Sequence, residues 1–350
     1  MELRKFVLDF DENSSEPKYK QIAKSIVENI EAGRIHVGDQ LPSISQLSID
    51  YLVSRDTVEK AYRLLRDQGV VESVKGKGFY VLISSPGSKI RVFVLFNKLS
   101  SYKKVVYNSL AYELRNHAKL ELFVYHCNLE LFESYITDKL GRYNYYVIMP
   151  HFIDSEIGPA EKNRITTVLN KINPEKLIFL DNIVDNVVKY KGAVYQDFKS
   201  DVFNALSEAS EQLRKYKKLV IVFPQNVPYP YPKKILEGFR KFCGFNNFEF
   251  EEVTEIKANT PVSKGTAYLI IEESDLSKLI KNVRNQNLKI GLDVGILTYN
   301  DTPLKEVLLE GISVISTEFS QLGVLASKII LNELSGAVKN EFKLVLRNSL

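Results

Sequence analysis

The chain has 350 residues, of which 45% are hydrophobic and 26% are charged, and its formal net charge at pH 7 is +4. This composition is typical of a soluble globular protein with two or three domains, and it excludes an intrinsically disordered chain. No apolar run approaches the roughly 18 residues of a membrane helix, and the N-terminus lacks the apolar core of a signal peptide. The two cysteines and four scattered histidines form neither a disulfide framework nor a metal-binding spacing. We therefore expect a cytoplasmic protein without a metal ion or cofactor.

Residues 1–83 open with the signals of three helices. Apolar residues at helical spacing predict a first amphipathic helix over residues 17–32. Ser43 is a natural N-cap for a second helix, and Ser54 is one for a third helix over residues 55–68.

A β-hairpin is predicted directly after the third helix. Residues 70–74 and 79–82 alternate between apolar and polar side chains around the short tip Lys-Gly-Lys-Gly at 75–78. Residues 1–83 contain 12 Lys and Arg against 13 Asp and Glu, so a DNA-binding face would have to concentrate its positive charge. The candidates for that face are Arg55, Lys60, Arg63, Lys75 and Lys77.

A set of residues spread over this domain carries a family resemblance. These residues are Pro17, Tyr19, Gln21, Ile22, Gly33, Gly38, Asp39, Leu41, Pro42, Ser43, Leu47, Val53, Ser54, Arg55, Thr57, Val58, Ala61, Tyr62, Leu65, Gly69, Gly76, Gly78, Tyr80 and Val81. Their pattern resembles the winged-helix domain of the GntR family of bacterial transcription regulators.

The GntR resemblance implies which residues contact DNA, because in that family the third helix starts in the major groove and the wing tip enters the minor groove. Arg55 would contact a guanine or a phosphate, and Ser54 and Thr57 would hold phosphates. Lys75 and Gly76 would lie in the minor groove. The full set implied is Ser43, Ser54, Arg55, Asp56, Thr57, Lys75, Gly76 and Lys77.

A second domain is expected over residues 90–350, after a small, polar linker at 84–89. Strand-length apolar runs lie at 90–96, 120–125, 145–149, 177–180, 193–195, 219–223, 248–253, 267–271, 290–297 and 312–315. Helix-length segments lie at 103–117, 129–140, 159–172, 198–215, 232–243, 275–286 and 319–335. Alternating strands and helices predict an α/β fold with parallel sheets covered on both faces. Ten strands exceed one comfortable sheet, so we expect two doubly wound lobes.

Ligands of doubly wound sheets bind beyond the carboxyl ends of the strands. Polar and aromatic residues follow the predicted strands, and carboxylates or amides beside aromatic rings suit a sugar. The expected effector-binding residues are Asn97, Tyr102, Phe152, Asp181, Asp197, Gln225, Asp275 and Asp301. An aspartate after a strand is also a common helix cap or turn former, and this alternative stays open for each one.

Fragments of the second domain carry another resemblance, in Asp181, Asp197, Gly238, Phe239, Glu273, Ser274, Asp275, Tyr299, Asn300, Asp301, Ser316, Thr317, Leu322, Gly323, Ala326, Leu346, Arg347, Asn348 and Ser349. With the strand and helix layout, they resemble the periplasmic-binding-protein fold of LacI/GalR-type regulators. This resemblance implies Asp275 as the best single effector contact. A GntR-type winged helix joined to such a body is similar to arabinose-type repressors.

These expectations describe a homodimeric regulator that binds double-stranded operator DNA and a small effector, a monosaccharide or a sugar phosphate. Repression of carbohydrate-utilisation genes is the favoured role, whereas the effector's identity and the operator sequence are not indicated. A second domain that only dimerises, or that binds a non-sugar metabolite, remains an alternative. A fused pyridoxal-phosphate enzyme-like body is less favoured, because no lysine has a convincing Schiff-base context. No GxSxG elbow or phosphate-binding loop occurs, so we expect no enzyme.

Overall fold

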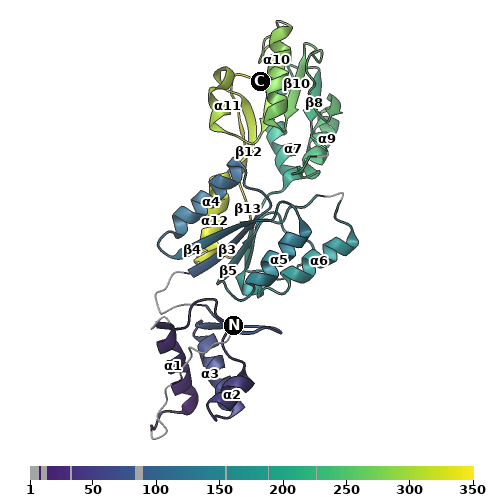
Figure 1. The fold of residues 1–350 in the computed structure, drawn as a ribbon. Helices are drawn as coiled ribbons and strands as arrows, with labels where there is room; N and C mark the ends of the chain where they lie inside the picture. The colour runs from purple at the N-terminus through teal and green to yellow at the C-terminus, as the bar shows by residue number, and fades with distance from the viewer. Residues whose placement is uncertain are drawn as a thin grey trace.

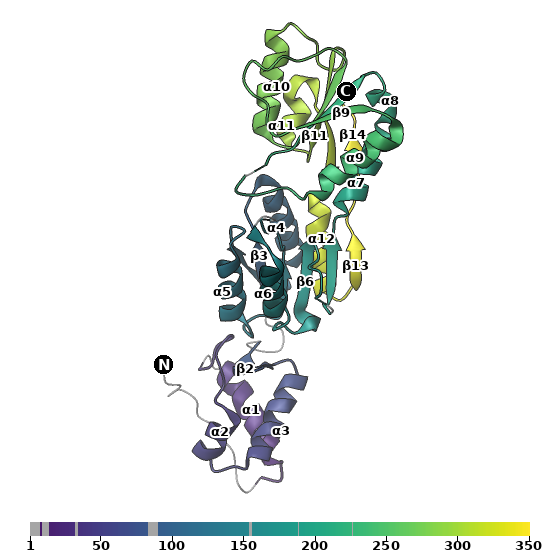
Figure 2. The same ribbon diagram turned by 90° about the vertical axis from the view of Figure 1, so that its right-hand side faces the viewer.

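The computed structural model describes residues 8, 14–31, 34–82, 90–153, 156–187, 189–225 and 227–350. The linker expected at residues 84–89 lies outside them. A small N-terminal domain and two α/β lobes follow one another along an elongated molecule (Figures 1 and 2). Within the described part of the chain, no helix is both long enough and apolar enough to cross a membrane.

The N-terminal domain is a winged helix, as the sequence predicted. Its elements are α1 (Lys18–Glu31), α2 (Ile44–Asp50), α3 (Arg55–Asp67), β1 (Val71–Val74) and β2 (Gly78–Val81). Ile22 and Ile26 of α1 pack with Val58 and Tyr62 of α3 in one buried cluster. The Tyr62 hydroxyl donates to the carbonyl of Pro42 at 2.8 Å, so the buried ring also has its polar end satisfied.

The turn between α2 and α3 holds a residue in a strained conformation. Leu52 has a φ of +52° and its side chain is 93% exposed. The left-handed region costs an L-residue about 1–2 kcal/mol, and glycine is largely free of that cost. We expect Leu52→Gly to raise the free energy of unfolding by about 1 kcal/mol in urea titrations, after glycine's larger chain entropy is subtracted. Leu52→Ala is the control: it keeps the strain, so a Gly variant no more stable than the Ala variant would contradict this account.

The lobe next to the winged helix, called here the N-lobe, is built on a parallel six-stranded sheet of order β13-β7-β6-β5-β3-β4. Its strands are β3 (Ile90–Phe96), β4 (Ala118–Val124), β5 (Tyr145–Ile148), β6 (Leu177–Asp181), β7 (Gly192–Tyr195) and β13 (Gly336–Lys339). Its helices are α4 (Ser101–Leu114), α5 (Leu129–Lys139), α6 (Pro159–Leu169), the 3-10 helix η2 (Pro174–Lys176) and α12 (Phe319–Ile330). Phe93 and Leu95 of β3 pack with α5 and α6, whereas Val92 and Val94 pack with α4 and α12. Both faces of the sheet are therefore buried, which explains the continuous apolar strands.

The far lobe, called here the C-lobe, has a six-stranded sheet of order β14-β12-β11-β10-β8-β9, in which β14 is antiparallel to β12. Its strands are β8 (Lys218–Val222), β9 (Glu249–Val253), β10 (Thr266–Ile270), β11 (Val294–Tyr299), β12 (Ser313–Thr317) and β14 (Phe342–Val345). Its helices are α7 (Phe198–Glu208), α8 (Ser210–Leu213), α9 (Lys234–Asn246), α10 (Glu273–Asn285), α11 (Pro303–Val307) and the 3-10 helix η3 (Leu308–Glu310). Two α/β lobes were expected, and the sheets confirm them.

The chain passes between the lobes after β7, after β12 and between β13 and β14. These crossovers lie side by side, since Asn340 donates its backbone N–H to the Tyr195 carbonyl and Glu318 donates its own to Glu341. Because α12 and β13 return to the N-lobe while the C-terminal strand lies in the C-lobe, neither lobe is one continuous segment (Figure 1).

The structure departs from the predicted elements in several places: α11 was not predicted, and α12 ends at Ile330 before the expected residue 335. Strands β13 and β14 were not predicted, because each has only four residues and lies at a sheet edge without a fully buried face. The strand expected at 290–297 begins only at Val294, since Gly291 adopts a φ of +81° in a preceding turn. The helix expected at 198–215 is divided at Ala209 into α7 and α8.

Candidate DNA-binding surface and effector cleft

The start of α3 forms an exposed polar surface. The Ser54 hydroxyl accepts from the backbone N–H of Thr57 at 3.1 Å and lies 2.8 Å from the Thr57 hydroxyl. Ser43 caps α2 in the same way, by accepting from Gln46 N–H. Arg55 is exposed, and no ion pair joins it to another described residue. This end of α3 can therefore present a cation and two hydroxyls to a phosphate or a base edge.

The other charges along α3 are largely paired within the helix. Lys60 lies 2.8 Å from Asp56, and Arg63 lies 3.1 Å from Glu59. Such exposed pairs contribute little to stability, but they lower the net positive potential of the helix. Asp56, which the GntR resemblance placed in the DNA-binding set, thus faces a lysine of its own helix.

The wing lies at the opposite end of the domain from the start of α3. Figures 1 and 2 show α2 far from the lobes, and Figure 2 shows β2 beside the N-lobe. Gly76 has a φ of +76°, which suits a tight tip, and Lys75 is exposed. The Lys77 ammonium donates to the carbonyl of Thr137 in the N-lobe at 2.6 Å. The structure therefore groups Ser54, Arg55, Asp56 and Thr57 but turns Lys77 toward its own chain.

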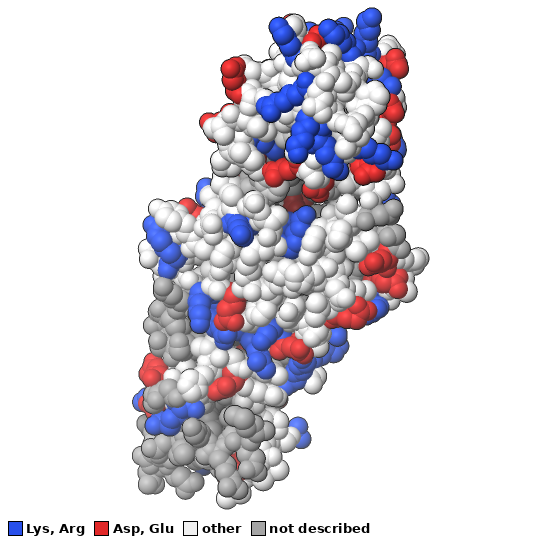
Figure 3. Space-filling model, turned by 45° about the horizontal axis from the view of Figure 1, so that its top comes forward, with Lys and Arg blue, Asp and Glu red and all other residues white. Residues whose placement is uncertain are grey.

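A cavity of about 440 Å³ lies between the two lobes. It is lined by the loop after β3 and the start of α4, by residues at or after the ends of β5, β6 and β7, by residues 230–232 before α9, and by residues at or after the ends of β10 and β11. It thus opens at the carboxyl ends of both sheets, where ligands of such sheets bind. Figure 3 shows the surface indented between the lobes, with basic and acidic side chains both near the indentation.

Asp181, the last residue of β6, is the central acid of the N-lobe wall. Its carboxylate lies 2.6 Å from His151 Nε2 and accepts a hydrogen bond from the Gln196 amide. Burial pushes the pKa of Asp181 upward, but the charges and hydrogen bonds of His151, Lys103 and Gln196 outweigh it and lower the pKa to about 2. The carboxylate is therefore ionised, and His151 and Gln196 are its hydrogen-bond partners within the N-lobe wall.

The same network continues from Asp181 to the lobe crossovers. Gln196 immediately follows β7, and its side-chain carbonyl accepts from the hydroxyl of Thr317, the last residue of β12. Two of the three crossovers are therefore hydrogen-bonded to a side chain of the cavity wall. A ligand that contacts Asp181 would act directly on residues that connect the lobes.

Lys103 is a buried cation of the N-lobe wall. Its ammonium donates to the Asn97 side-chain carbonyl, and the Asn97 amide lies 3.4 Å from Cys127 Sγ. Burial lowers the pKa of Lys103 to about 8, although the nearby Asp181 carboxylate opposes this effect.

Stability is expected to depend on pH through Lys103. The folded-state pKa of about 8 lies below the ordinary value of 10.5, so between these values the unfolded chain binds more protons and stability rises with pH. Relative to Lys103→Met, the wild-type free energy of unfolding should rise by about 2–3 kcal/mol as pH increases from about 8 to 10.5. Chemical denaturation at each pH measures it. Lys104→Met, at an exposed neighbour, is the control, and equal slopes for the two variants would refute the account.

The C-lobe wall supplies a second acid. The Tyr231 hydroxyl donates to Glu272 Oε1 at 2.7 Å. Lys98, from the N-lobe, places its ammonium 5.0 Å from the Tyr229 ring centroid and 5.5 Å from that of Tyr231. Burial lowers the pKa of Lys98, against the opposing effect of Glu272. These contacts join the N-lobe wall and the C-lobe wall of the cavity.

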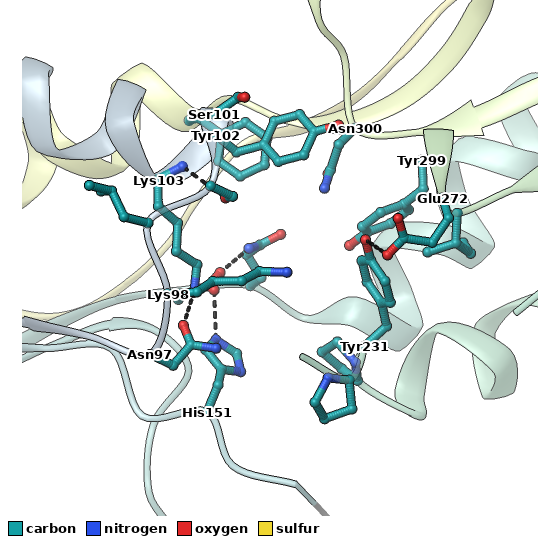
Figure 4. Close-up of a pocket in the computed structure, with 18 of the residues that line it drawn as sticks. Asn97, Lys98, Ser101, Tyr102, Lys103, His151, Tyr231, Glu272, Tyr299 and Asn300 are labelled. Carbon is teal, nitrogen blue, oxygen red and sulfur yellow. Dashed lines mark hydrogen bonds and ion pairs between the residues drawn. The ribbon is translucent and has the colours of Figure 1, made fainter. Parts of the chain in front are cut away.

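Polar atoms and aromatic rings both face the cavity. Tyr102 and Phe319 stack with their ring centroids 5.0 Å apart. Asn300 Oδ1 is buried, and no described residue donates a hydrogen bond to it. Figure 4 shows Lys98 and Asn300 directed into the open space from opposite sides. The cavity thus combines flat apolar surfaces with donors and acceptors.

The structure brings only some of the expected effector residues to this cavity. Asn97, Tyr102 and Asp181 line it. Phe152 lines an adjoining hollow of about 260 Å³, and Gln225 lies in another of about 550 Å³ among C-lobe loops.

The remaining expected acids, Asp197, Asp275 and Asp301, do not line the 440 Å³ cavity. Asp197 caps α7 by accepting from Ser200 N–H, which is the alternative that the sequence left open. Asp301 forms a two-bond ion pair with Arg347. Asp275 lies in the hollow with Gln225, and its carboxylate accepts from the backbone N–H of Ile256 at 2.9 Å. Each carboxylate is committed to a protein partner.

Several cavity residues were missing from the sequence-based set: Lys98, His151, Gln196, Tyr231, Glu272 and Asn300. Most of them lie within three residues of the end of a strand, so their position after a predicted strand could have identified them as candidates. The sequence could not show which of two neighbouring polar residues faces the ligand, and Gln196 beside Asp197 is the clearest case.

Comparison with known proteins divides the chain in two. Residues 18–81 match the family described as bacterial regulatory proteins, gntR family. This part is 35% identical over 75 residues to the HTH-type transcriptional repressor YtrA of Bacillus subtilis, and 46% identical over 65 residues to the mannosyl-D-glycerate transport/metabolism system repressor MngR of Escherichia coli. The matches cover 21% and 19% of this chain, and 58% and 27% of those proteins. The N-terminal domain is thus a GntR-type helix-turn-helix domain.

The two lobes resemble a different set of structures. A LacI family transcriptional regulator from Lactobacillus casei with bound sucrose superimposes with a TM-score of 0.58 and 11% sequence identity. The alignment covers 74% of this chain and 99% of that one. The body therefore has the LacI-like fold.

Proposed function

We propose that this chain, a GntR-type winged helix joined to a body of LacI-like fold, is a transcription regulator whose operator affinity depends on a small effector. The effector is a monosaccharide or a sugar phosphate held between the lobes. The observation that carries the proposal is the 440 Å³ cavity at the carboxyl ends of both sheets, within the size range of small-molecule sites.

The chemistry of the cavity supports a hydroxyl-rich ligand. The carboxylates of Asp181 and Glu272 can accept from hydroxyl groups, and Lys98 and the Asn300 amide can donate to ring or hydroxyl oxygens. The stacked rings of Tyr102 and Phe319 offer a flat surface to C–H groups. No catalytic step is part of the proposal.

The mechanism rests on the lobe crossovers. An effector that bridges Asp181 and Glu272 favours the closed arrangement of the lobes and moves the crossovers at Gln196 and Thr317. In a homodimer, this changes the spacing of two winged helices relative to two DNA half-sites. The coupling free energy is expected to be about 1–3 kcal/mol. We favour a coupling in which effector binding releases DNA, as in a repressor of carbohydrate-utilisation genes.

Two measurements on the full-length protein test the proposal. Selection from random duplexes should enrich an operator with two related half-sites. A panel of monosaccharides and sugar phosphates should contain a compound that raises the melting temperature and changes affinity for the selected duplex.

Other outcomes separate the alternatives. An operator with flat melting curves across the panel would favour a body that only dimerises or that binds a non-sugar metabolite. Failure to enrich any duplex would refute the DNA-binding assignment.

A further inference from the structure

The wing of the GntR-type domain packs directly against the N-lobe of its own chain. Val74 and Tyr80 of the wing belong to the same buried cluster as Leu140 and Tyr146 of the N-lobe. A Cβ atom on Gly141 would lie 2.4 Å from the Val74 side chain and 3.0 Å from the Tyr80 ring. The wing therefore fits against the bare backbone at Gly141, and this contact is part of the N-lobe core.

An ion pair lies beside this apolar contact. Glu72 Oε2 of β1 and Lys176 Nζ of the N-lobe are 2.8 Å apart, and their side chains are only 12% and 16% exposed. Both atoms are shielded from solvent. Among the described residues, neither atom has a further hydrogen-bond partner. Each charge thus depends on the other, since an isolated charge in this position would be strongly unfavourable.

Two hydrogen bonds extend the contact on either side. Lys77 at the wing tip donates to the Thr137 carbonyl at 2.6 Å, and Arg91 donates to the Val37 carbonyl at 3.2 Å. Arg91 is held in place by Glu121, 3.0 Å away. We call the N-lobe surface formed by Arg91, Thr137, Gly141 and Lys176 the wing dock.

We propose that the wing dock and DNA compete for the wing. Lys77, which the GntR resemblance includes in the DNA-binding set, cannot donate the same hydrogen bond to the Thr137 carbonyl and to a phosphate. Docking also fixes the wing against a lobe, so that seating it in a groove requires the Glu72–Lys176 pair and the apolar contact to separate. The chain with its wing docked is the form with low DNA affinity, both with and without bound effector. This inference rests on the proposed function, because it needs a winged helix that binds DNA.

A charge-reversal cycle on the full-length protein tests the competition. Lys176→Glu, Glu72→Lys and the double variant are each titrated with a labelled random-sequence duplex at low salt. Lys176→Glu is decisive, because plain electrostatics predicts weaker DNA binding for an added negative charge, whereas release of the wing predicts tighter binding. We expect at least fivefold tighter binding, and a return toward wild type in the double variant. Lys162→Glu, the same change on the exposed face of α6, is the control and should not tighten binding.

Hydrogen exchange reports on docking without DNA. Amides of β1, β2 and the segment around Gly141 should exchange faster in Lys176→Glu and recover in the double variant. If Lys176→Glu binds the duplex no better than Lys162→Glu, the competition is refuted while DNA binding stands. If exchange is unchanged in both single variants, the docked arrangement itself is refuted. If wild type and every variant fail to bind any duplex, the proposed function fails as well.

Discussion

Arg55→Ala is expected to weaken binding of the selected operator by about ten- to a hundredfold, since a good base contact contributes roughly 1–3 kcal/mol. Arg55 is exposed at the start of α3 and has no ion-pair partner among the described residues. Removing it deletes a contact to DNA without disturbing the packing of Val58 and Tyr62 behind it. Fluorescence anisotropy with operator and random duplexes measures the change.

The control for Arg55 is Arg63→Ala, which removes the same charge from the same helix. Arg63 already pairs with Glu59 at 3.1 Å, so its loss should weaken binding only slightly. The effector-induced rise in melting temperature should survive in both variants, because both positions lie far from the cavity. In Arg55→Ala, the ratio of operator affinity to random-duplex affinity could stay constant while the slope of log affinity against log salt concentration falls by about one. That result would assign Arg55 to a phosphate contact. An unaltered operator footprint would show that α3 is not the recognition helix.

The second large effect is expected from Asp181→Asn, which should abolish the response to the effector. Asparagine keeps the shape of the side chain but removes the buried carboxylate charge that lies 2.6 Å from His151 Nε2 and near Lys103. Removing one partner of a buried charge network costs about 3–5 kcal/mol, so the free energy of unfolding should also fall. Calorimetric titration of the folded variant with the effector separates lost binding from lost stability.

Asp197→Asn is the matched control for Asp181→Asn. The Asp197 carboxylate caps α7, and asparagine caps a helix about as well as aspartate, so the effector response should be retained. An Asp181→Asn protein that still binds the effector normally would remove Asp181 from the binding site.

The pH dependence gives an independent check on Asp181. The pKa of Asp181 is about 2, below the ordinary value of 3.8. The contribution of Asp181 to stability is therefore complete above pH 3.8 and is lost as pH falls from 3.8 toward 2. The stability that Asp181 contributes through its lowered pKa should therefore decline only as pH falls below about 4, which acid denaturation of wild type against Asp181→Asn measures.

The winged helix could be predicted from the sequence because its signals are local. Ser43 and Ser54 accept hydrogen bonds from backbone N–H groups three residues ahead, and the apolar positions of α3 repeat at helical spacing. The body was predictable to the level of two doubly wound lobes for the same reason, since most of its strands are buried on both faces and read as continuous apolar runs.

The candidate cavity was predictable only in part. Asn97 and Asp181 were expected because they follow long, buried strands whose ends can be placed closely. Asp275 lies outside the 440 Å³ cavity because it belongs to the first turn of α10, where a shift of one residue turns a side chain by about 100°. Lys98 was missed because its partners, the Tyr229 and Tyr231 rings, come from the other lobe.

By itself, the sequence determined most of the elements, their order and the two kinds of domain, because capping, periodicity and burial patterns act between residues close along the chain. Only the tertiary structure decided which strand-end side chains share one cavity and that the wing rests on the N-lobe. The pairs that define these features, Gln196 with Thr317 and Glu72 with Lys176, join segments far apart in the chain. Such pairs form only once whole lobes have packed, so no local pattern encodes them.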